Sequence, residues 1–153
     1  MSSSVDSRIP ALVIVIKQWA KSHDINSAFK GSLSSYCLVS MIIYFLQTGL
    51  SPPILPPLKS YVDNLEKVNV NTQLQHLVPK TFIKFDIRNK EELGDIFVKF
   101  FQFWVKKFRQ NKIFSLYTAQ ESIRTYNQPF LDTSAYVLVI QGKMIFMRYI
   151  FKF

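Results

Sequence analysis

Two lysines stand four residues apart in a segment with helical periodicity, and this spacing could hold a polyanion. Lys17 and Lys21 follow apolar residues that recur every three or four positions, so both ammonium groups should lie on one face of a helix. Two neighbouring cations repel each other, and a phosphate shared between them relieves that repulsion. The alternative is an ordinary solvated helix face, which the spacing alone favours.

A second candidate is the run Ser34-Ser35-Tyr36, which opens a strongly apolar segment. Hydroxyls and free N–H groups at the start of a helix bind phosphate well. The ring of Tyr36 could stack on a nucleic-acid base. The alternative is helix capping by the serines, with the tyrosine in the core.

The third candidate is a basic cluster that surrounds Phe108 and consists of Lys106, Lys107, Arg109 and Lys112. Basic side chains interleaved with an aromatic ring suit single-stranded RNA. The alternative is a solvated rim of a β-hairpin, and the pattern does not choose between the two.

Three helices must position these residues. The first is expected over Asp6 to Lys21, where apolar residues form one stripe. The second follows the serines, is apolar nearly all round and ends at Gly49, which is typical of a helix buried on most sides. The third runs from about Lys90 to Val105 and begins with a capping-box pattern, Asn89-Lys90-Glu91-Glu92.

The remaining segments predict little regular structure. Residues 51–58 form a Pro-rich connector, and Tyr61 to Asp86 should be irregular. Residues 108–116 suggest a short hairpin that turns at Asn111-Lys112. A last helix, capped by Asp132 or Thr133, should carry Val137, Ile140, Met144, Met147 and Phe151. We therefore expect one mostly α domain over residues 1–153, with one short β-hairpin.

Composition narrows the class of protein. The 153 residues carry a net charge of +9, which favours nucleic acid or an anionic membrane as partner. A hydrophobic content of 48% excludes a disordered chain, and one cysteine excludes an internal disulfide or a Cys-rich zinc site. Without a signal peptide or an apolar run of membrane-spanning length, a soluble protein of a reducing compartment is expected.

Taken in order, these segments resemble the central and PAP-associated domains of the cytoplasmic poly(A) polymerase and terminal uridylyltransferase family. The resemblance extends over about residues 6–151. The matching motifs are Ile16-Lys17-Gln18-Trp19-Ala20-Lys21, Asp24-Ile25-Asn26, Gly31-Ser32-Leu33-Ser34-Ser35-Tyr36, Pro52-Pro53-Ile54-Leu55-Pro56, residues 89–101, Ile113-Phe114-Ser115-Leu116 and Gln128-Pro129-Phe130.

The resemblance implies a role for each residue of the first two candidates. Lys17, Lys21 and Ser35 would hold the triphosphate of an incoming ATP or UTP, and Tyr36 would stack on its base. The family adds nucleotides to RNA 3′ ends without a template, with Mg²⁺ or Mn²⁺. The resemblance also implies a protein of the cytoplasm with no membrane association. Its expected partners are RNA 3′ ends, together with a catalytic-domain chain or an RNA-binding adaptor protein.

Several features depart from the family pattern. The family holds its metal ions with three aspartates that precede the lysine helix, whereas Asp6 is the only acidic residue before Lys17. No metal ligand or catalytic residue is therefore assigned to this chain, and alone it should not extend RNA. In the nucleotide-recognition loop the family's acidic positions are Gln128 and Leu131, and Ser134 or Ala135 stands near the position of a base-selecting histidine.

Two interpretations follow. In the first, the chain is the nucleotide- and RNA-binding portion of an RNA tailing enzyme whose catalytic portion lies elsewhere. In the second, it is a non-catalytic relative that acts as a protein-interaction or regulatory module. An upstream segment with the catalytic aspartates would favour the first, and a genuine start at Met1 would favour the second. A membrane-surface protein is a third interpretation, which rests on charge alone.

Overall fold

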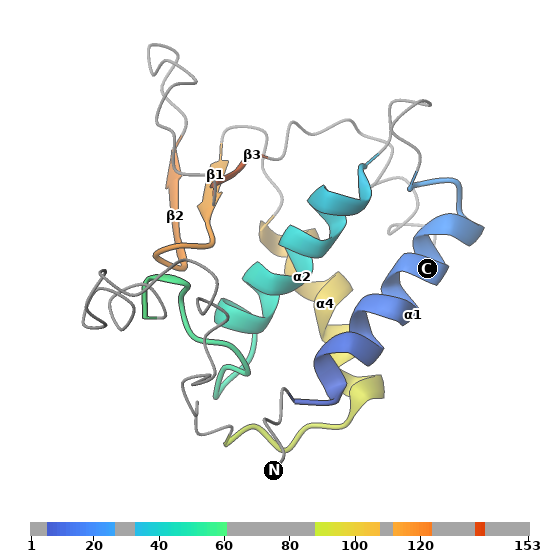
Figure 1. The fold of residues 1–153 in the computed structure, drawn as a ribbon, viewed down its shortest axis with the longest axis horizontal. Helices are drawn as coiled ribbons and strands as arrows, with labels where there is room; N and C mark the ends of the chain where they lie inside the picture. Colours follow the sequence, from blue (N-terminus) through green and yellow to red (C-terminus); the bar gives the residue numbers. More distant parts are fainter. Residues whose placement is uncertain (1–5, 27–32, 61–87, 108–111, 124–136, 140–153) are drawn as a thin grey trace, which may run out of the picture.

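The computed structural model describes residues 6–26, 33–60, 88–107, 112–123 and 137–139. Three helices, α1 (Arg8–Ser22), α2 (Ser35–Thr48) and α4 (Leu93–Lys107), pack against one another (Figure 1). Three short strands, β1 (Lys112–Ser115), β2 (Gln120–Ile123) and β3 (Val137–Val139), form an antiparallel sheet in the order β2-β1-β3. The described part of the chain is therefore mostly helical, as predicted.

The apolar stripes of the helices meet in one core. Leu12, Ile16 and Ala20 of α1 are fully buried, as are Ile96, Phe100 and Trp104 of α4. Both sets follow the helical spacing, so the predicted faces are confirmed. Aromatic rings of α2, α4 and β1 contact one another edge to face in this core: Tyr44, Phe45, Phe100, Phe103, Trp104 and Phe114.

The strands differ from the expectation in two places. A hairpin is present, but it joins β1 to β2 through residues 116–119, where Ala119 has a φ of 56°, and not through Asn111-Lys112. Lys112 instead starts β1. Val137–Val139 is a strand that pairs with β1, so the last helix expected there is wrong at these residues. A short apolar run is compatible with a helix or with a strand. Backbone pairing with β1 makes these residues a strand.

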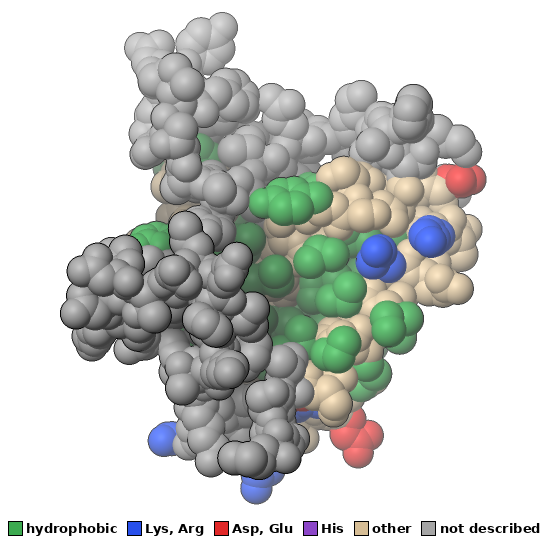
Figure 2. Space-filling view, in the orientation of Figure 1, with side chains coloured by type: hydrophobic (Ala, Val, Ile, Leu, Met, Phe, Trp, Pro, Cys, Tyr) green, Lys and Arg blue, Asp and Glu red, His purple; other side chains and the backbone are tan. Residues whose placement is uncertain are grey.

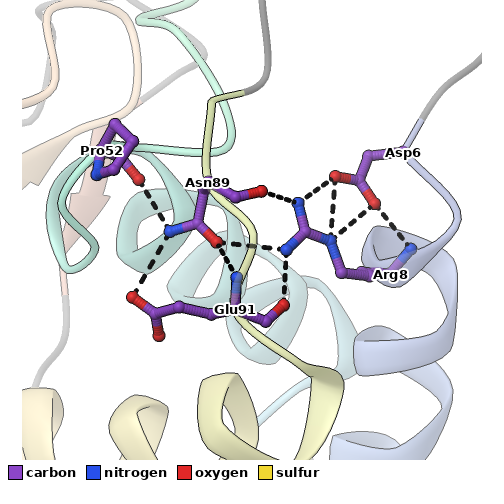
Figure 3. A network of polar contacts seen from close by, with 5 residues as sticks. All are labelled: Asp6, Arg8, Pro52, Asn89 and Glu91. Carbon is purple, nitrogen blue, oxygen red and sulfur yellow. Dashed lines mark hydrogen bonds and ion pairs between the residues drawn. The ribbon is translucent and has the colours of Figure 1, made fainter.

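Arg8 ties the start of α1 to the residues that precede α4, and Asn89 links those residues to the Pro-rich segment (Figure 3). Its guanidinium donates to the Asp6 carboxylate, to the Asn89 side chain and to the carbonyl oxygens of Asn89 and Glu91. Asn89 in turn donates to the Pro52 carbonyl at 2.9 Å. Asn89 thus links the start of α1, the Pro-rich segment and the residues that precede α4. The capping box predicted to begin at Asn89 is wrong, since α4 begins later, at Leu93.

The residues that follow α2 turn back onto it. Ile54 and Leu55 both donate their backbone N–H groups to the carbonyl of Leu46, and Ile54 is 1% exposed. The Leu58 N–H then donates to the carbonyl of Leu116, beside the sheet.

The irregular stretch expected over residues 61–86 lies outside the described residues. Of the helices described, none is both long and apolar enough to cross a membrane.

Candidate nucleotide site

The C-terminal end of α1 is closed by a tight backbone turn. The Ile25 N–H donates to the Ala20 carbonyl at 2.9 Å, and the Asp24 N–H donates to the Lys21 carbonyl at 3.1 Å. This pair of bonds is the Schellman arrangement, and it requires the left-handed backbone that Asp24 adopts with a φ of 55°. The turn buries Ile25 in the core, at 1% exposed, and Asn26 follows directly.

The first turn of α2 meets this end of α1. The Ser34 hydroxyl accepts a hydrogen bond from the Cys37 N–H at 3.1 Å, which caps the helix as expected. The next hydroxyl, that of Ser35, donates to Asn26 Oδ1 at 3.1 Å. The two helices run in opposite directions, so the end of α1 and the start of α2 lie at the same edge of the molecule (Figure 1).

The four residues assigned to the nucleotide site, Lys17, Lys21, Ser35 and Tyr36, are all accessible at this edge. Lys21 and Ser35 are exposed and Lys17 is half-buried. Tyr36 is 70% exposed, so its ring is not part of the core. The structure therefore places a hydroxyl and an aromatic ring at the start of α2, where the helix dipole is positive, and two cations on the C-terminal half of α1.

An apolar surface adjoins this site. On α1, Ile14 is 67% exposed and Val15 is 41% exposed. In the space-filling view, hydrophobic side chains gather over α1 and α2 beside basic side chains (Figure 2). An apolar surface of this kind on a helix usually marks a contact with another chain or another domain.

The basic cluster is brought together only in part. Lys106 is exposed at the end of α4, whereas Lys107 and Lys112 both contact Glu121 of β2. Their Nζ atoms lie 3.1 and 2.8 Å from the two carboxylate oxygens. The hydrogen bond from Lys112, followed by that from Lys107, lowers the pKa of Glu121. Arg109 lies outside the described residues.

No metal site is found among the described residues. They contain no group of three His, Cys, Asp or Glu side chains that could hold an ion. Asp6 is engaged by Arg8, whose hydrogen bonds lower the pKa of its carboxyl group. Burial raises the pKa of the Cys37 thiol to about 11, so it is protonated at neutral pH. Gln128, Leu131, Ser134 and Ala135 lie outside the described residues.

Two residues at these sites escaped the sequence-based assignment. Asn26 contacts Ser35 because of the turn at Asp24, and an aspartate in place of the usual glycine hides that turn. Glu121 lies near Lys112 because the strand register sets Lys112 opposite Ile123, two residues after Glu121 on the same face. Lys107 reaches Glu121 from the end of α4. The charge of Glu121 alone carried no signal of these contacts.

Comparison with known proteins identifies relatives. No protein-family model matches the chain. The poly(A) RNA polymerase GLD2-B of Xenopus laevis is 39% identical over 123 residues, which cover 79% of this chain and 24% of that protein. The chain thus spans about a quarter of the length of the curated relatives that it matches.

Comparison with solved structures identifies relatives of the same kind. The GLD-2/RNP-8 complex matches with a TM-score of 0.61 and 32% identity, covering 77% of this chain and 36% of that chain. A cytoplasmic RNA terminal U-transferase matches with a TM-score of 0.50 and 28% identity, covering 71% and 34% respectively. Over most of its length, the chain is therefore homologous to the GLD2 poly(A) polymerases and to the terminal uridylyltransferases, as a region similar to their PAP-associated domain.

Proposed function

We propose that this chain is the nucleotide- and RNA-binding portion of a template-independent RNA 3′-end nucleotidyltransferase. The observation that carries the proposal is the meeting of α1 and α2, which puts two lysines, a serine hydroxyl and an exposed tyrosine at one edge of a chain homologous to RNA tailing enzymes. Two solved relatives support nucleotide binding, since one is a variant of mtPAP with ATPγS and another is a variant of the Cid1 poly(U) polymerase with MgATP.

In this proposal each side chain has a distinct task. Lys17 and Lys21 neutralise the triphosphate, Ser35 donates a hydrogen bond to it, and Tyr36 stacks on the base. Stacking tolerates any base, because every base offers a π face. The preference between ATP and UTP therefore belongs to residues other than these four.

The described residues do not fit a catalytic metal ion, so no step that involves Mg²⁺ or Mn²⁺ is assigned to them. The exposed α1 face that holds Ile14 and Val15 would contact the catalytic portion of the enzyme. The remaining assignments are that the basic cluster contacts RNA near its 3′ end, that an adaptor protein joins the enzyme, and that the enzyme acts in the cytoplasm. The adaptor is supported by the relative GLD-2, which was solved with RNP-8, and the compartment by the cytoplasmic U-transferase.

The nucleotide site is tested by ATP and UTP binding to the purified chain. Lys17→Ala/Lys21→Ala should weaken the binding of both nucleotides by about tenfold or more, because two charge-assisted contacts to the triphosphate are lost. Lys90→Ala/Lys99→Ala removes the same charge from exposed positions before and within α4 and should change the Kd by less than about twofold.

Isothermal titration calorimetry measures both Kd values, and circular dichroism checks that each variant is folded. If the Lys17/Lys21 variant binds ATP as tightly as the parent chain, or if both double variants lose the same affinity, the proposed nucleotide site is wrong.

A further inference from the structure

We propose, on the basis of the function above, that Asn26 is a positioning residue which controls whether the Ser35 hydroxyl can donate a hydrogen bond to a bound phosphate. The observation is the hydrogen bond from Ser35 Oγ to Asn26 Oδ1, 3.1 Å long. A serine hydroxyl has a single hydrogen, so it donates to one partner at a time. In this arrangement that hydrogen points to Asn26, and Ser35 offers an anion only lone pairs.

The amide of Asn26 can reverse this arrangement. Its side chain carries an acceptor, Oδ1, and a donor, Nδ2, and its terminal torsion has two broad and nearly equivalent orientations. Rotation by about half a turn brings Nδ2 to Ser35 Oγ as a donor. The hydroxyl hydrogen is then available for a phosphate oxygen, and Ser35 is hydrogen-bonded to Asn26 in both orientations.

The surroundings allow this rotation while the backbone stays in place. Ile25 is fixed in the core and by its N–H bond to Ala20, so the Cα of Asn26 is held. The Asn26 side chain is half-buried and Ser35 is exposed, so water solvates the amide during the rotation. The switch therefore needs no rearrangement of either helix.

Asn26→Asp tests this switch because a carboxylate has the same shape as the amide but can only accept hydrogen bonds. The introduced carboxylate would keep the Ser35 hydrogen, and the variant should bind ATP about tenfold more weakly than the parent chain. Asn26→Ala releases the hydroxyl and should lose less affinity, about threefold or less, although it deletes more atoms. A structural role alone predicts that the alanine variant loses as much or more.

Two controls isolate the hydrogen bond. Gln18→Glu adds the same negative charge to the exposed side of α1, and its effect on the ATP Kd is the contribution of charge alone. In a Ser35→Ala background, Asn26→Asp should cost no more than Gln18→Glu, since the hydroxyl that it would restrain is absent. Adenosine, which has no phosphate, should bind the parent and Asn26→Asp chains equally.

The outcomes separate the two proposals. Loss of ATP affinity in Lys17→Ala/Lys21→Ala, together with equal losses in Asn26→Asp and Gln18→Glu, overturns the role of Asn26 and leaves the nucleotide site standing. A greater loss in the alanine than in the aspartate variant also overturns it. A parent chain that does not bind ATP overturns both proposals.

Discussion

Glu121 places a carboxylate between two of the lysines that the sequence pattern assigns to RNA. Lys107 and Lys112 each contact one of its oxygens, so the cluster offers RNA less positive charge than its composition implies. An exposed ion pair contributes little to stability, at about 0–1 kcal/mol. The consequence of Glu121 is therefore expected mainly in RNA binding.

Glu121→Gln should raise the affinity of the chain for single-stranded RNA by about threefold to tenfold, because both lysines become available to phosphates. The slope of log Kd against log salt should steepen by about 1.4, the value expected for two additional phosphate contacts on a single strand. Fluorescence anisotropy at several salt concentrations measures both quantities.

Glu92→Gln makes the same charge change at an exposed position before α4 and is the matched control. Equal affinities for the two variants would show that Lys107 and Lys112 do not bind RNA.

At the scale of elements, α1 and α4 could be predicted because each has a periodic apolar face, and α2 because its apolar run is too long for a strand. Within the nine residues from Ile96 to Trp104, the buried side chains lie at the positions that the apolar spacing predicted. The hairpin turn could not be predicted, since Ala119 holds a left-handed conformation that glycine or asparagine usually marks. β3 is three residues long, which is too short for periodicity to identify.

The candidate site could likewise be predicted from the sequence only in part. The spacing of Lys17 and Lys21 and the serines before α2 follow from local rules, and their side chains were assigned from the sequence. The contact between Asn26 and Ser35, which are nine residues apart, depends on where α1 ends and how α2 begins. No local pattern reports that geometry.

Gly49 gives a prediction about the end of α2. Its φ of −90° suits any residue, so the glycine is not required by the backbone. A Cβ atom at this position would lie 2.7 Å from Phe45 Cε2 and 3.0 Å from Phe103 Cδ2, inside the aromatic core. Gly49→Ala should lower the free energy of unfolding by about 1–3 kcal/mol, as overpacking does.

Gly94 of α4 is the control, because a Cβ atom there meets nothing within 4 Å. Gly94→Ala should stabilise the chain by about 0.5–1 kcal/mol through helix propensity. Urea denaturation measures both variants, and a neutral or stabilising Gly49→Ala would mean that the close approach of the two rings does not determine the residue.

At the scale of the whole molecule, an apolar face of α1 is exposed to solvent. The chain spans about a quarter of the length of its curated relatives. We assign that face to the catalytic portion of the proposed enzyme. Its side chains should then contribute to association and little to the folding of this chain.

Ile14→Thr and Ile16→Thr make the same substitution on the exposed and buried sides of α1. Ile14 is 67% exposed, so its variant should change the free energy of unfolding by less than about 0.5 kcal/mol and reduce self-association at high concentration. Ile16 is 0% exposed, and its variant should cost about 2–4 kcal/mol.

Urea denaturation and analytical ultracentrifugation measure these effects. Equal destabilisation by the two variants would contradict the division of α1 into a core face and a contact face.

The central claim is that a nucleotide binds where α1 ends and α2 begins, and the most direct measurement is photo-crosslinking with an ATP analogue that carries an azide on its base. Trypsin cuts after Lys30 and Lys59, so Tyr36 lies in the peptide of residues 31–59. We predict that mass spectrometry finds the label on this peptide, that unlabelled ATP competes it away, and that Lys17→Ala/Lys21→Ala abolishes it. Label confined to other peptides, or label that persists in the double variant, would contradict the account.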